Sequence, residues 1–552
     1  MSAARRPHRA SRDDVDTWAR ADALGDLLVR AQQRAPELDG VVFPDGERLS
    51  FTRLLERSRT LARGLIGLGI EPRERVGVMM ANSPDTVATL FAVWLAGATA
   101  VPLNIRYRRA ELPFVFADAA LKAIVTSDRI DSHVDLAALA LSAATPDLCT
   151  VVCLGNPKPG TTSEARLVEL AGEGFEDELE LRRAAVRLRD IAVLLYTSGT
   201  TAQPRGCLLT HEALTRNWTT VGEILGVGAG DRVWAPCPLF HLGAIGPLLM
   251  CVSAAASFLS DTFFEPVRAL DLIVTERANH LYPAYPPITQ SLLDTPGFQQ
   301  ADLSSARTIL NVAPPETLRQ MQQAFPSLTQ VSLYGLTEGG GAVTYNSLSE
   351  DLRARVETCG LPLPGTEVRI VDPASGADLE PGAEGEILFR GPGRCEGYAN
   401  DPEKNRIVFD AAGWCHTGDR GTLDDTGRLS FRGRLKEMLK VGGENVAPAE
   451  VEAWLMGHPA VKLAQVVGVP DARLEEVPAA FVELRSGYEV SAEELLEHCR
   501  SGMARFKLPH YVRFVSDWPM SATKVQKGIL RDGLLAELSP SANSPEIAEV
   551  PR

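Results

Sequence analysis

Apolar residues follow two alternating patterns over the first four fifths of the chain. Residues 51–68 and 85–95 repeat apolar side chains at the three- and four-residue spacing of amphipathic helices, whereas residues 191–195 form a short apolar run typical of a buried strand. The alternation continues with an expected helix over 211–225, a strand over 231–236 and a helix over 245–259. This order predicts an α/β architecture in which mainly parallel sheets are covered by helices.

The pattern changes after residue 360. Short apolar segments separated by Pro and Gly turns predict a small, mostly antiparallel β-rich subdomain, with strands at 368–371, 385–389 and 428–431. A compact α+β pattern follows, with helices at 448–456 and 492–503 and strands at 461–467 and 479–484. We therefore expect an N-terminal domain over 16–433, a hinge at 434–436, a small α+β C-terminal domain over 437–535, and disordered tails at 1–15 and 536–552.

Composition narrows the possible functions. The 552 residues exceed one ordinary domain, and 45% hydrophobic with 23% charged residues is typical of a globular protein. A net charge of −15 argues against a general nucleic-acid or anionic-membrane binder. The nine cysteines show no CxxC pair, which favours reduced thiols, and the apolar run at 245–259 is too short to span a membrane. With no apolar stretch behind the N-terminal arginines, a cytoplasmic protein is expected.

The most informative polar segment directly follows the strand at 191–195. It contains Thr197, Ser198, Gly199, Thr200 and Thr201, with Arg205 shortly after. Backbone N–H groups and hydroxyls in such a loop can surround an anion, and glycine allows close approach. The spacing does not fit the common Gly-x4-Gly-Lys-Ser/Thr loop. We interpret the segment as a polyphosphate site; a plain polar connector is the alternative.

Five further segments support the interpretation of this loop as a polyphosphate site. They are residues 238–241, 334–338, 413–419, 433–445 and 519–531. Together with the loop, and in this order, they resemble the signature motifs of the adenylate-forming superfamily, and specifically its acyl-CoA ligase branch. The superfamily includes acyl- and aryl-CoA synthetases, peptide-synthetase adenylation domains and firefly-type luciferases, and the resemblance covers residues 24–535. It implies that ATP and a carboxylic acid form an acyl-adenylate, after which the small mobile C-terminal domain rotates and a thiol, usually that of coenzyme A, attacks.

The resemblance also implies roles for the first step. Thr197, Ser198, Gly199, Thr200, Thr201 and Arg205 would hold pyrophosphate, and Glu338 would hold Mg²⁺, a cation that prefers oxygen ligands. Tyr334, Gly335 and Thr337 would lie beside adenine and the α-phosphate, and Asp419 with Arg434 would bind the ribose hydroxyls. The alternatives are a solvated surface carboxylate for Glu338 and an interdomain ion pair for Asp419 and Arg434.

Further residues are assigned to the acyl group and to the second step. His241 would flank the acyl carboxylate, unless it is a satisfied core histidine, and the pocket walls would come from Asn311, Val312, Ala313, Gly339 and Gly340. The glycine run that ends at Gly341 suggests space for a bulky acid. Lys524 would be the adenylation lysine and Lys436 the hinge residue. The loop used for thioester formation would contain Lys440, Gly442, Gly443 and Glu444.

Three departures from the family pattern concern the first step. Ala202 replaces a usual glycine, and Arg205 replaces a lysine although a guanidinium does not replace an ammonium freely. No glycine precedes Lys524, so its assignment requires a one-residue deletion, and Lys527 is the alternative. One extended residue spans up to ~3.5 Å. An error of roughly 1 Å in a catalytic group costs about a hundredfold in rate.

Three functions are therefore considered. The first is a complete AMP-forming acid–thiol ligase that uses ATP, Mg²⁺ and coenzyme A, with its adenylation step weakened by the missing glycine. The second is a half-enzyme that only converts a preformed acyl-adenylate, supplied by a separate adenylating enzyme. The third is an adenylate-binding regulator without turnover, which the joint presence of Lys440, Lys524, Glu338 and Asp419 argues against. A ligase that acts on a separate carrier protein is the nearest enzyme alternative.

Overall fold

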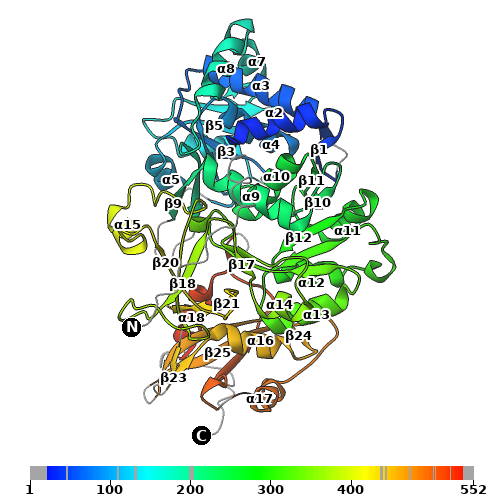
Figure 1. Ribbon diagram of the computed structural model, residues 1–552, viewed down its shortest axis with the longest axis vertical. Coiled ribbons are helices and arrows are strands. Elements are labelled where there is room, and N and C mark those ends of the chain that lie inside the picture. The colour runs from blue at the N-terminus through cyan, green and yellow to red at the C-terminus, as the bar shows by residue number, and fades with distance from the viewer. Residues whose placement is uncertain are drawn as a thin grey trace.

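The protein consists of a large α/β body and a smaller C-terminal domain, shown in orange and red in Figure 1. The computed structural model describes residues 22–44, 48–107, 111–129, 134–197, 204–435, 439–441, 444–471, 474–501, 503, 505–521 and 524–538. Strands and helices alternate through the first part of the chain, and an antiparallel region and an α+β domain follow. The predicted fold class is confirmed.

One seven-stranded sheet carries the strand that precedes the proposed phosphate loop. Its strand order is β7-β6-β5-β3-β4-β8-β9, and all neighbours are parallel except the antiparallel pair β8 and β9. The strands are β3 (Arg75–Met79), β4 (Thr99–Pro102), β5 (Leu121–Ser127), β6 (Thr150–Leu154), β7 (Thr162–Ser163), β8 (Ile191–Thr197) and β9 (Arg205–Thr210). The helices along this part of the chain are α3 (Phe51–Gly67), α4 (Pro84–Leu95), α5 (Leu112–Asp118), α6 (Leu136–Ser142), α7 (Glu164–Leu170) and α8 (Glu176–Ala185).

The second seven-stranded sheet has the order β14-β13-β12-β10-β11-β1-β2, and only β1 and β2 are antiparallel neighbours. Its strands are β1 (Asp39–Val42), β2 (Arg48–Ser50), β10 (Arg232–Trp234), β11 (Ser257–Leu259), β12 (His280–Ala284), β13 (Thr308–Asn311) and β14 (Thr329–Val331). The associated helices are α2 (Leu24–Arg34), α9 (His211–Leu225), α10 (Leu242–Ala254), α11 (Pro266–Thr275), α12 (Pro286–Leu293) and α13 (Pro315–Ala324).

The helix expected over 245–259 is partly wrong. Helix α10 ends at Ala254, Ala255 adopts a left-handed conformation with φ 57°, and the chain then enters β11. Strand β11 and the helix from Ala244 to Val252 are buried, so their apolar residues form one nearly continuous run. Such a run does not distinguish a buried helix from a buried strand.

A single hydrophobic core joins the two large sheets. Helices α3, α4, α9 and α10 contribute to it, and Val193 of one sheet and Val233 of the other belong to the same cluster. Trp94 of α4 is 1% exposed and donates its indole N–H to the carbonyl of Ala192 at 3.0 Å. This hydrogen bond attaches α4 to β8, the strand that leads into the proposed phosphate loop.

The β-rich region forms two antiparallel sheets. One has the order β18-β19-β20-β21, with strands β18 (Glu367–Val371), β19 (Gly385–Arg390), β20 (Cys415–Leu423) and β21 (Leu429–Arg434). The other contains β15 (Leu333–Tyr334), β16 (Thr344–Tyr345) and β17 (Leu361–Pro362). Two short helices accompany them, α14 (Leu352–Glu357) and α15 (Pro402–Val408).

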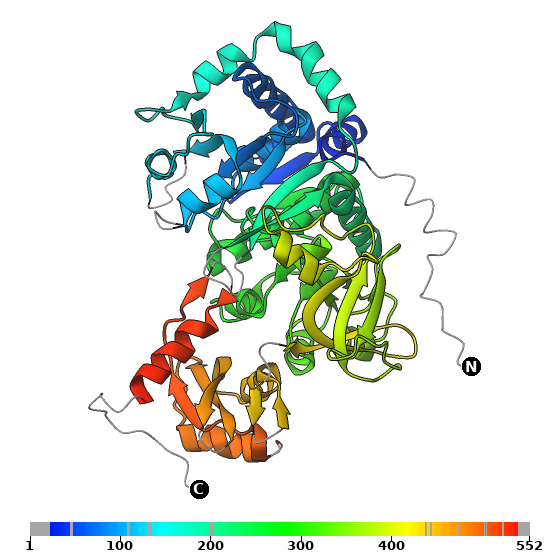
Figure 2. The same ribbon diagram turned by 90° about the vertical axis from the view of Figure 1, so that its left-hand side faces the viewer.

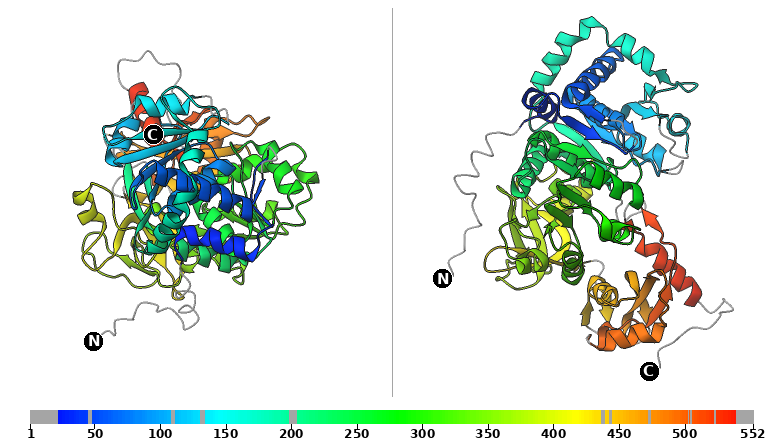
Figure 3. Two further views of the ribbon diagram at one scale, coloured as in Figure 1. Left: turned by 90° about the horizontal axis from the view of Figure 1, so that it is seen from above. Right: turned by 90° about the vertical axis from the view of Figure 1, so that its right-hand side faces the viewer.

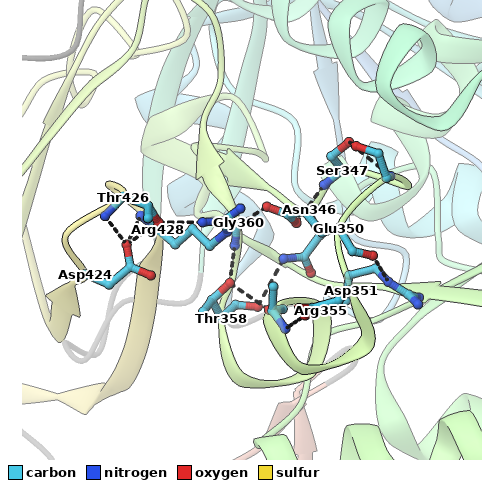
Figure 4. Close-up of polar contacts among 12 residues, drawn as sticks. Asn346, Ser347, Glu350, Asp351, Arg355, Thr358, Gly360, Asp424, Thr426 and Arg428 are labelled. Atoms are coloured by element: carbon cyan, nitrogen blue, oxygen red, sulfur yellow. Dashed lines mark hydrogen bonds and ion pairs between the residues drawn. The ribbon is translucent and has the colours of Figure 1, made fainter.

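A polar network fastens these two sheets to each other (Figure 4). Glu350 accepts hydrogen bonds from Arg428 at 2.8 Å and from the N–H of Ser347 at 3.0 Å, and the amide of Asn346 donates to the carbonyl of Thr358. Arg428 belongs to the β20–β21 hairpin, whereas Asn346 directly follows β16. The network therefore holds β16 against the sheet that contains Asp419.

The C-terminal domain is built on a five-stranded sheet with β23-β22-β25-β24 in order and β26 beside β25. Its strands are β22 (Leu439–Val441), β23 (Glu444–Val446), β24 (Val461–Asp471), β25 (Glu475–Leu484) and β26 (Tyr511–Phe514), and its helices are α16 (Pro448–Met456), α17 (Ala492–Arg500) and α18 (Lys527–Leu538). Helix α18 continues past residue 535, so the tail predicted from 536 is wrong for its first three positions. The predicted hinge residue Lys436 lies outside the described residues.

A separate hairpin of β27 (Met520–Ser521) and β28 (Lys524–Val525) precedes α18. Figures 2 and 3 both show this red hairpin reaching from the small domain toward the large body. Within the described part of the chain, none of the helices has the length and apolar character needed to cross a membrane.

Candidate active site

A cleft lies between the large body and the C-terminal domain. Its volume is about 2430 Å³, and its lining includes Tyr334, Gly335, Asp419, Arg434 and Lys524. These residues come from segments far apart in the sequence, in or next to β15, β20, β21 and β28. Residues assigned to the nucleotide thus meet the predicted adenylation lysine in one place.

Asp419 is a buried carboxylate with one oxygen already occupied. The Tyr334 hydroxyl donates to its Oδ2 at 2.7 Å. Nε of Arg434 lies 3.3 Å from Oδ1, yet Oδ1 accepts no hydrogen bond from any described residue. Burial raises the pKa of Asp419, while Arg434 and the Tyr334 hydroxyl act in the opposite direction. The expected interdomain ion pair is thus a pair within one sheet, because Asp419 and Arg434 are register partners in β20 and β21, and it leaves one carboxylate oxygen without a hydrogen bond.

Glu338 is fixed by neighbours that the sequence did not single out. It lies in the short 3-10 turn Thr337–Gly339 and accepts a hydrogen bond at Oε1 from the Tyr398 hydroxyl at 2.5 Å. Its carbonyl accepts from the N–H of Cys395 at 2.8 Å. Glu338 is thus an oriented carboxylate and not a freely solvated one, and nothing in the sequence sixty residues away pointed to Tyr398.

Only the two ends of the proposed phosphate loop lie within the described residues. Thr197 ends β8, and its hydroxyl is 3.5 Å from the carbonyl of Arg205. Arg205 begins β9, and its Nε lies 3.4 Å from a carboxylate oxygen of Asp401. Pro204, the residue before β9, lines the cleft, so the chain re-enters the sheet at the edge of the cleft. Four predicted cradle residues lie outside the described part: Ser198, Gly199, Thr200 and Thr201.

His241 occupies the N-cap position of α10 and is partly buried. Its Nε2 has no hydrogen-bond partner among the described residues. Burial, with smaller contributions from the charges of Lys524 and Arg106, lowers the pKa of His241 to about 4. A neutral imidazole with an unpaired nitrogen is not a satisfied core histidine. The charge of Lys524, which lines the cleft, lowers the pKa of both His241 and Asp419.

Asn82 holds the segment that ends at His241. Its carboxamide oxygen accepts from the N–H of Leu239 at 2.7 Å, and its Nδ2 donates to the carbonyl of Cys237 at 2.9 Å. The same Nδ2 lies 3.2 Å from the Ser260 hydroxyl and from the carbonyl of Asp261. Sequence reasoning missed this residue; its place just beyond a parallel strand was the available signal, because sites gather at that edge.

The residues predicted to line the acyl pocket separate into two kinds. Val312 and Ala313 line the cleft. The side chain of Asn311 is instead engaged within the fold, where its Oδ1 accepts from Thr289 at 2.5 Å and its Nδ2 donates to Gln330 at 3.1 Å. Asn311 therefore supports the strand that carries the other two.

The glycine run does not leave empty space. A Cβ on Gly340 would lie 2.8 Å from Nδ2 of Asn217, and one on Gly341 would lie 2.9 Å from the ring of Trp218. Both glycines have positive φ, at 67° and 95°. A Cβ on Gly335 would meet the carbonyl of Gly341 at 2.1 Å. The suggestion that these glycines make room for a bulky acid is wrong, since they permit close packing.

The two candidate adenylation lysines have different surroundings. Lys527 pairs with Glu452 of α16, with Nζ 2.6 Å from Oε1, and so is engaged within the C-terminal domain. Lys524 is opposite Ser521 in the β27–β28 register, which leaves only residues 522–523 between the paired positions.

The segment assigned to thioester formation is a second hairpin. Lys440 lies in β22 opposite Asn445, and Glu444 begins β23, whereas Gly442 and Gly443 lie outside the described residues. In Figure 1, β23 is on the side of the small domain that points away from the large body. This hairpin and the Lys524 hairpin therefore do not occupy the cleft together.

Comparisons with known proteins identify two matching regions. Residues 28–399 match the family model described as AMP-binding enzyme, and residues 450–524 match the model of the AMP-binding enzyme C-terminal domain. The chain is 33% identical to an acyl-CoA synthetase, YngI of Bacillus subtilis, over 92% of this chain and 96% of that protein.

Two further relatives carry names that include their acids. The chain is 35% identical to a Mycobacterium tuberculosis CoA ligase named for a methyl-dioxo-octahydroindenyl propanoyl group, over 92% of this chain and 97% of that protein. The crystal structure of the anthranilate CoA ligase AuaEII with anthranoyl-AMP superposes with a TM-score of 0.84 at 27% identity, and the match covers 94% of this chain and 98% of that one.

Proposed function

The chain belongs to the AMP-binding enzyme family of the adenylate-forming superfamily, in its acyl-CoA ligase branch, and from this premise we propose that it converts a carboxylic acid to an acyl-CoA thioester in two steps. In the first, a carboxylate oxygen attacks the α-phosphorus of ATP and pyrophosphate leaves. In the second, the thiol sulfur of coenzyme A attacks the acyl carbon, its proton is lost and AMP leaves.

One observation carries the proposal: Asp419 and Lys524, which come from different domains, line the same cleft, and the charge of Lys524 also acts on His241. The positive charge of Lys524 lowers the pKa of both His241 and Asp419, although Lys524 belongs to the other domain. A cation placed there would stabilise negative charge that develops between the acyl carboxylate and the α-phosphate. The neutral imidazole of His241 would lie beside the carboxylate without adding charge.

The residues present fit a nucleotide and a magnesium ion. The open Oδ1 of Asp419 suits a ribose hydroxyl, because a buried carboxylate oxygen without a donor is otherwise costly. Among the described residues no group of three or more His, Cys, Asp or Glu could hold a metal ion. Glu338 alone suits Mg²⁺, which usually combines one or two carboxylates with substrate phosphates. When bound, Mg²⁺ would neutralise phosphate charge.

The hairpin supports retention of the adenylation step. Lys524 lines the cleft and is paired with Ser521 in the β27–β28 register, which supports the proposal that it acts there without the missing glycine. The half-enzyme remains the second candidate because Arg205 is paired with Asp401 and the phosphate loop departs from the family pattern. In that case a separate enzyme would supply the acyl-adenylate.

The deciding experiment compares two sources of the acyl group. One reaction contains acid, ATP, Mg²⁺ and coenzyme A, and the other contains synthetic acyl-adenylate and coenzyme A. A complete ligase gives product in both, whereas a half-enzyme gives product only from the adenylate. Product in neither, across a panel of acids and their adenylates, would contradict both forms and favour a regulator without turnover.

Two lysine variants sharpen this comparison. Lys524→Ala should reduce the ATP-dependent reaction about a hundredfold or more and spare thioester formation from the adenylate. Lys527→Ala is the matched control, since its ammonium pairs with Glu452, and it should retain most of the ATP-dependent rate. The reverse result would exchange the assignments of the two lysines.

A glycine inserted before Lys524 tests the deletion itself. It would lengthen the hairpin loop to three residues, a length that accommodates glycine well. An ATP-dependent rate that stays within about threefold would indicate that Lys524 already reaches its target, whereas a gain of tenfold or more would show weakened adenylation.

A further inference from the structure

The two carboxylate oxygens of Glu338 have different surroundings. Oε1 accepts a hydrogen bond from the Tyr398 hydroxyl at 2.5 Å, a length typical of a charge-assisted O–H···O⁻ bond. Oε2 makes no hydrogen bond with any residue that the structure describes, and the side chain is partly exposed. One oxygen is therefore held by the fold, and the other is open to a ligand.

The partner of Glu338 is neutral, unlike the partners of other carboxylates in and beside the cleft. Asp419 lies beside Arg434, and Glu452 pairs with Lys527. Among the described residues, no Lys, Arg or His lies within ion-pair distance of Glu338. A tyrosine hydroxyl orients a carboxylate without cancelling its charge. The negative charge of Glu338 is thus left for a cation to neutralise.

Tyr398 is fixed by the fold and not by a ligand. The side chain of Asn405 accepts from the N–H of Tyr398 at 2.7 Å and donates to its carbonyl at 2.8 Å. Tyr398 also forms an isolated antiparallel bridge with Cys207 of β9, and its ring lies 5.9 Å from the ring of Phe409. Because Tyr398 is only 8% exposed, the surrounding structure determines where its hydroxyl lies.

The segment that carries Tyr398 connects Glu338 to the strand that follows the proposed phosphate loop. The N–H of Cys395 donates to the carbonyl of Glu338 at 2.8 Å. The carbonyl of Gly397 accepts from the N–H of Leu208 in β9 at 2.9 Å. The segment is therefore bonded both to the turn of Glu338 and to β9, and one framework holds the carboxylate and the end of the loop.

We propose that Tyr398 is a positioning residue that limits Glu338 to one-oxygen coordination of a cation and thereby makes the site select Mg²⁺ against Ca²⁺. The inference rests on the proposed function, in which Glu338 holds the cation. Ca²⁺ takes about six to eight oxygen ligands and accepts carboxylates through both oxygens. Mg²⁺ is smaller and usually binds one or two carboxylates together with waters and substrate phosphates.

The hydrogen bond from Tyr398 acts against Ca²⁺ in particular. Two-oxygen coordination would require Oε1 of Glu338 to release this bond, and a buried hydroxyl would then lose its acceptor. One-oxygen coordination through Oε2 leaves the bond intact. The hydroxyl therefore penalises the coordination mode that Ca²⁺ commonly uses and does not penalise the one that suits Mg²⁺.

The test measures cation binding directly, in the complex of the protein with the α,β-methylene analogue of ATP, which cannot release pyrophosphate. Mn²⁺ bound to this complex is followed by electron paramagnetic resonance and displaced with Mg²⁺ or with Ca²⁺. Tyr398→Phe should reduce the preference for Mg²⁺ over Ca²⁺ by about tenfold, because a residue that orients a metal ligand has an effect of this size. An equal change in both affinities, or no change in either, would overturn the proposal.

Two further measurements support the comparison. The complex of the unmodified protein should prefer Mg²⁺ over Ca²⁺ more strongly than the ATP analogue alone does, and an equal preference would overturn the proposal even if Tyr398→Phe does not fold. Tyr196→Phe is the matched control, since it removes another hydrogen bond from a tyrosine to a carboxylate, of 2.7 Å to Asp118. It should leave the cation preference unchanged, and a loss equal to that of Tyr398→Phe would refute a specific role for Tyr398.

Glu338→Gln separates this inference from the assignment on which it rests. This variant should weaken the binding of Mn²⁺ to the complex; unchanged binding would refute Glu338 as the cation ligand and the proposal with it. If Mn²⁺ binding weakens in Glu338→Gln but Tyr398→Phe keeps the full preference for Mg²⁺, this inference alone fails. The ligase function is refuted separately, by the absence of acyl-CoA from every acid and acyl-adenylate, because the binding measurements do not depend on turnover.

Discussion

At the scale of single residues, burial decides which groups are charged in this protein. His241 keeps a neutral imidazole because its environment disfavours the charged form, with Lys524 adding to the effect. The same physics acts on a carboxyl group away from the cleft. Asp261 is 1% exposed, accepts a hydrogen bond from the Trp234 indole at 2.9 Å, and has a second oxygen without a partner among the described residues.

Asp261 should make the protein less stable as pH rises. Burial raises the pKa of Asp261 from 3.8 to about 7 in the folded state, so between these values the unfolded chain has released a proton that the folded chain retains. Stability is therefore lost progressively through this window, by up to about 4 kcal/mol above it. Asp261→Asn should raise the unfolding free energy at pH 8 and have little effect at pH 4.

The measurement is denaturant unfolding of both proteins at the two pH values. Asp271→Asn, at an exposed position of α11, serves as the control and should leave the pH dependence unchanged. A loss of stability in Asp261→Asn at both pH values would show that the folded protein is stabilised by an ionised Asp261, contrary to the prediction.

At the scale of elements, the site depends on segments held by residues outside it. Asn82 follows β3 yet fixes the segment before α10, and the hydrogen bonds around Glu350 hold β16 to the β20–β21 hairpin. The hairpin that carries Lys524 shows the same principle, because its register sets where the lysine points.

Asn82→Ala should reduce kcat/KM for the acid more than it reduces the stability of the protein. It removes the acceptor for the N–H of Leu239 and the donor to the carbonyl of Cys237, so the segment that presents His241 can move. We expect kcat/KM for the acid to fall about ten- to a hundredfold, the effect of a displacement of roughly 1 Å, with a smaller change in the KM for ATP.

Ser83→Ala is the matched control for this variant. Ser83 is the adjacent buried residue and caps α4 by accepting from the N–H of Thr86 at 3.2 Å. Loss of this cap should reduce the unfolding free energy by about 1 kcal/mol without changing kcat/KM for the acid. Equal activity losses in the two variants would refute a positioning role for Asn82.

At the scale of the whole molecule, Lys524 lies in the cleft between the two domains and the Lys440 hairpin lies away from it, an arrangement that we propose serves adenylation. One contact between the domains is an ion pair in which Nη1 of Arg485 lies 3.9 Å from Oδ1 of Asp294. Because both side chains are partly exposed, the pair makes a small contribution that favours this arrangement.

Asp294→Lys should slow adenylation by about two- to fivefold, because a like-charge contact replaces a weak exposed ion pair. Thioester formation from the acyl-adenylate, which we assign to the rotated arrangement, should not be slowed. Single-turnover measurements of each step test this, with the charge-swapped double variant Asp294→Lys/Arg485→Glu expected to restore the first step. Equal slowing of both steps would contradict the assignment.

The sequence by itself determined the fold class, the order of the motifs and the family, because periodicity and local motifs are properties of neighbouring residues. Helices α9 and α16 have the predicted bounds, and the resemblance to the adenylate-forming superfamily is confirmed. The roles of Lys524, Asp419 and Glu338 stay predictions, although the first two line one cleft.

Only the tertiary structure decided which side chains are near each other. It paired Lys527 with Glu452, assigned the glycine run to packing against Asn217 and Trp218, and brought Tyr398 to Glu338. The physical reason is that burial and unsatisfied hydrogen bonds depend on residues that are distant in the chain, and these relations are not encoded in any local pattern.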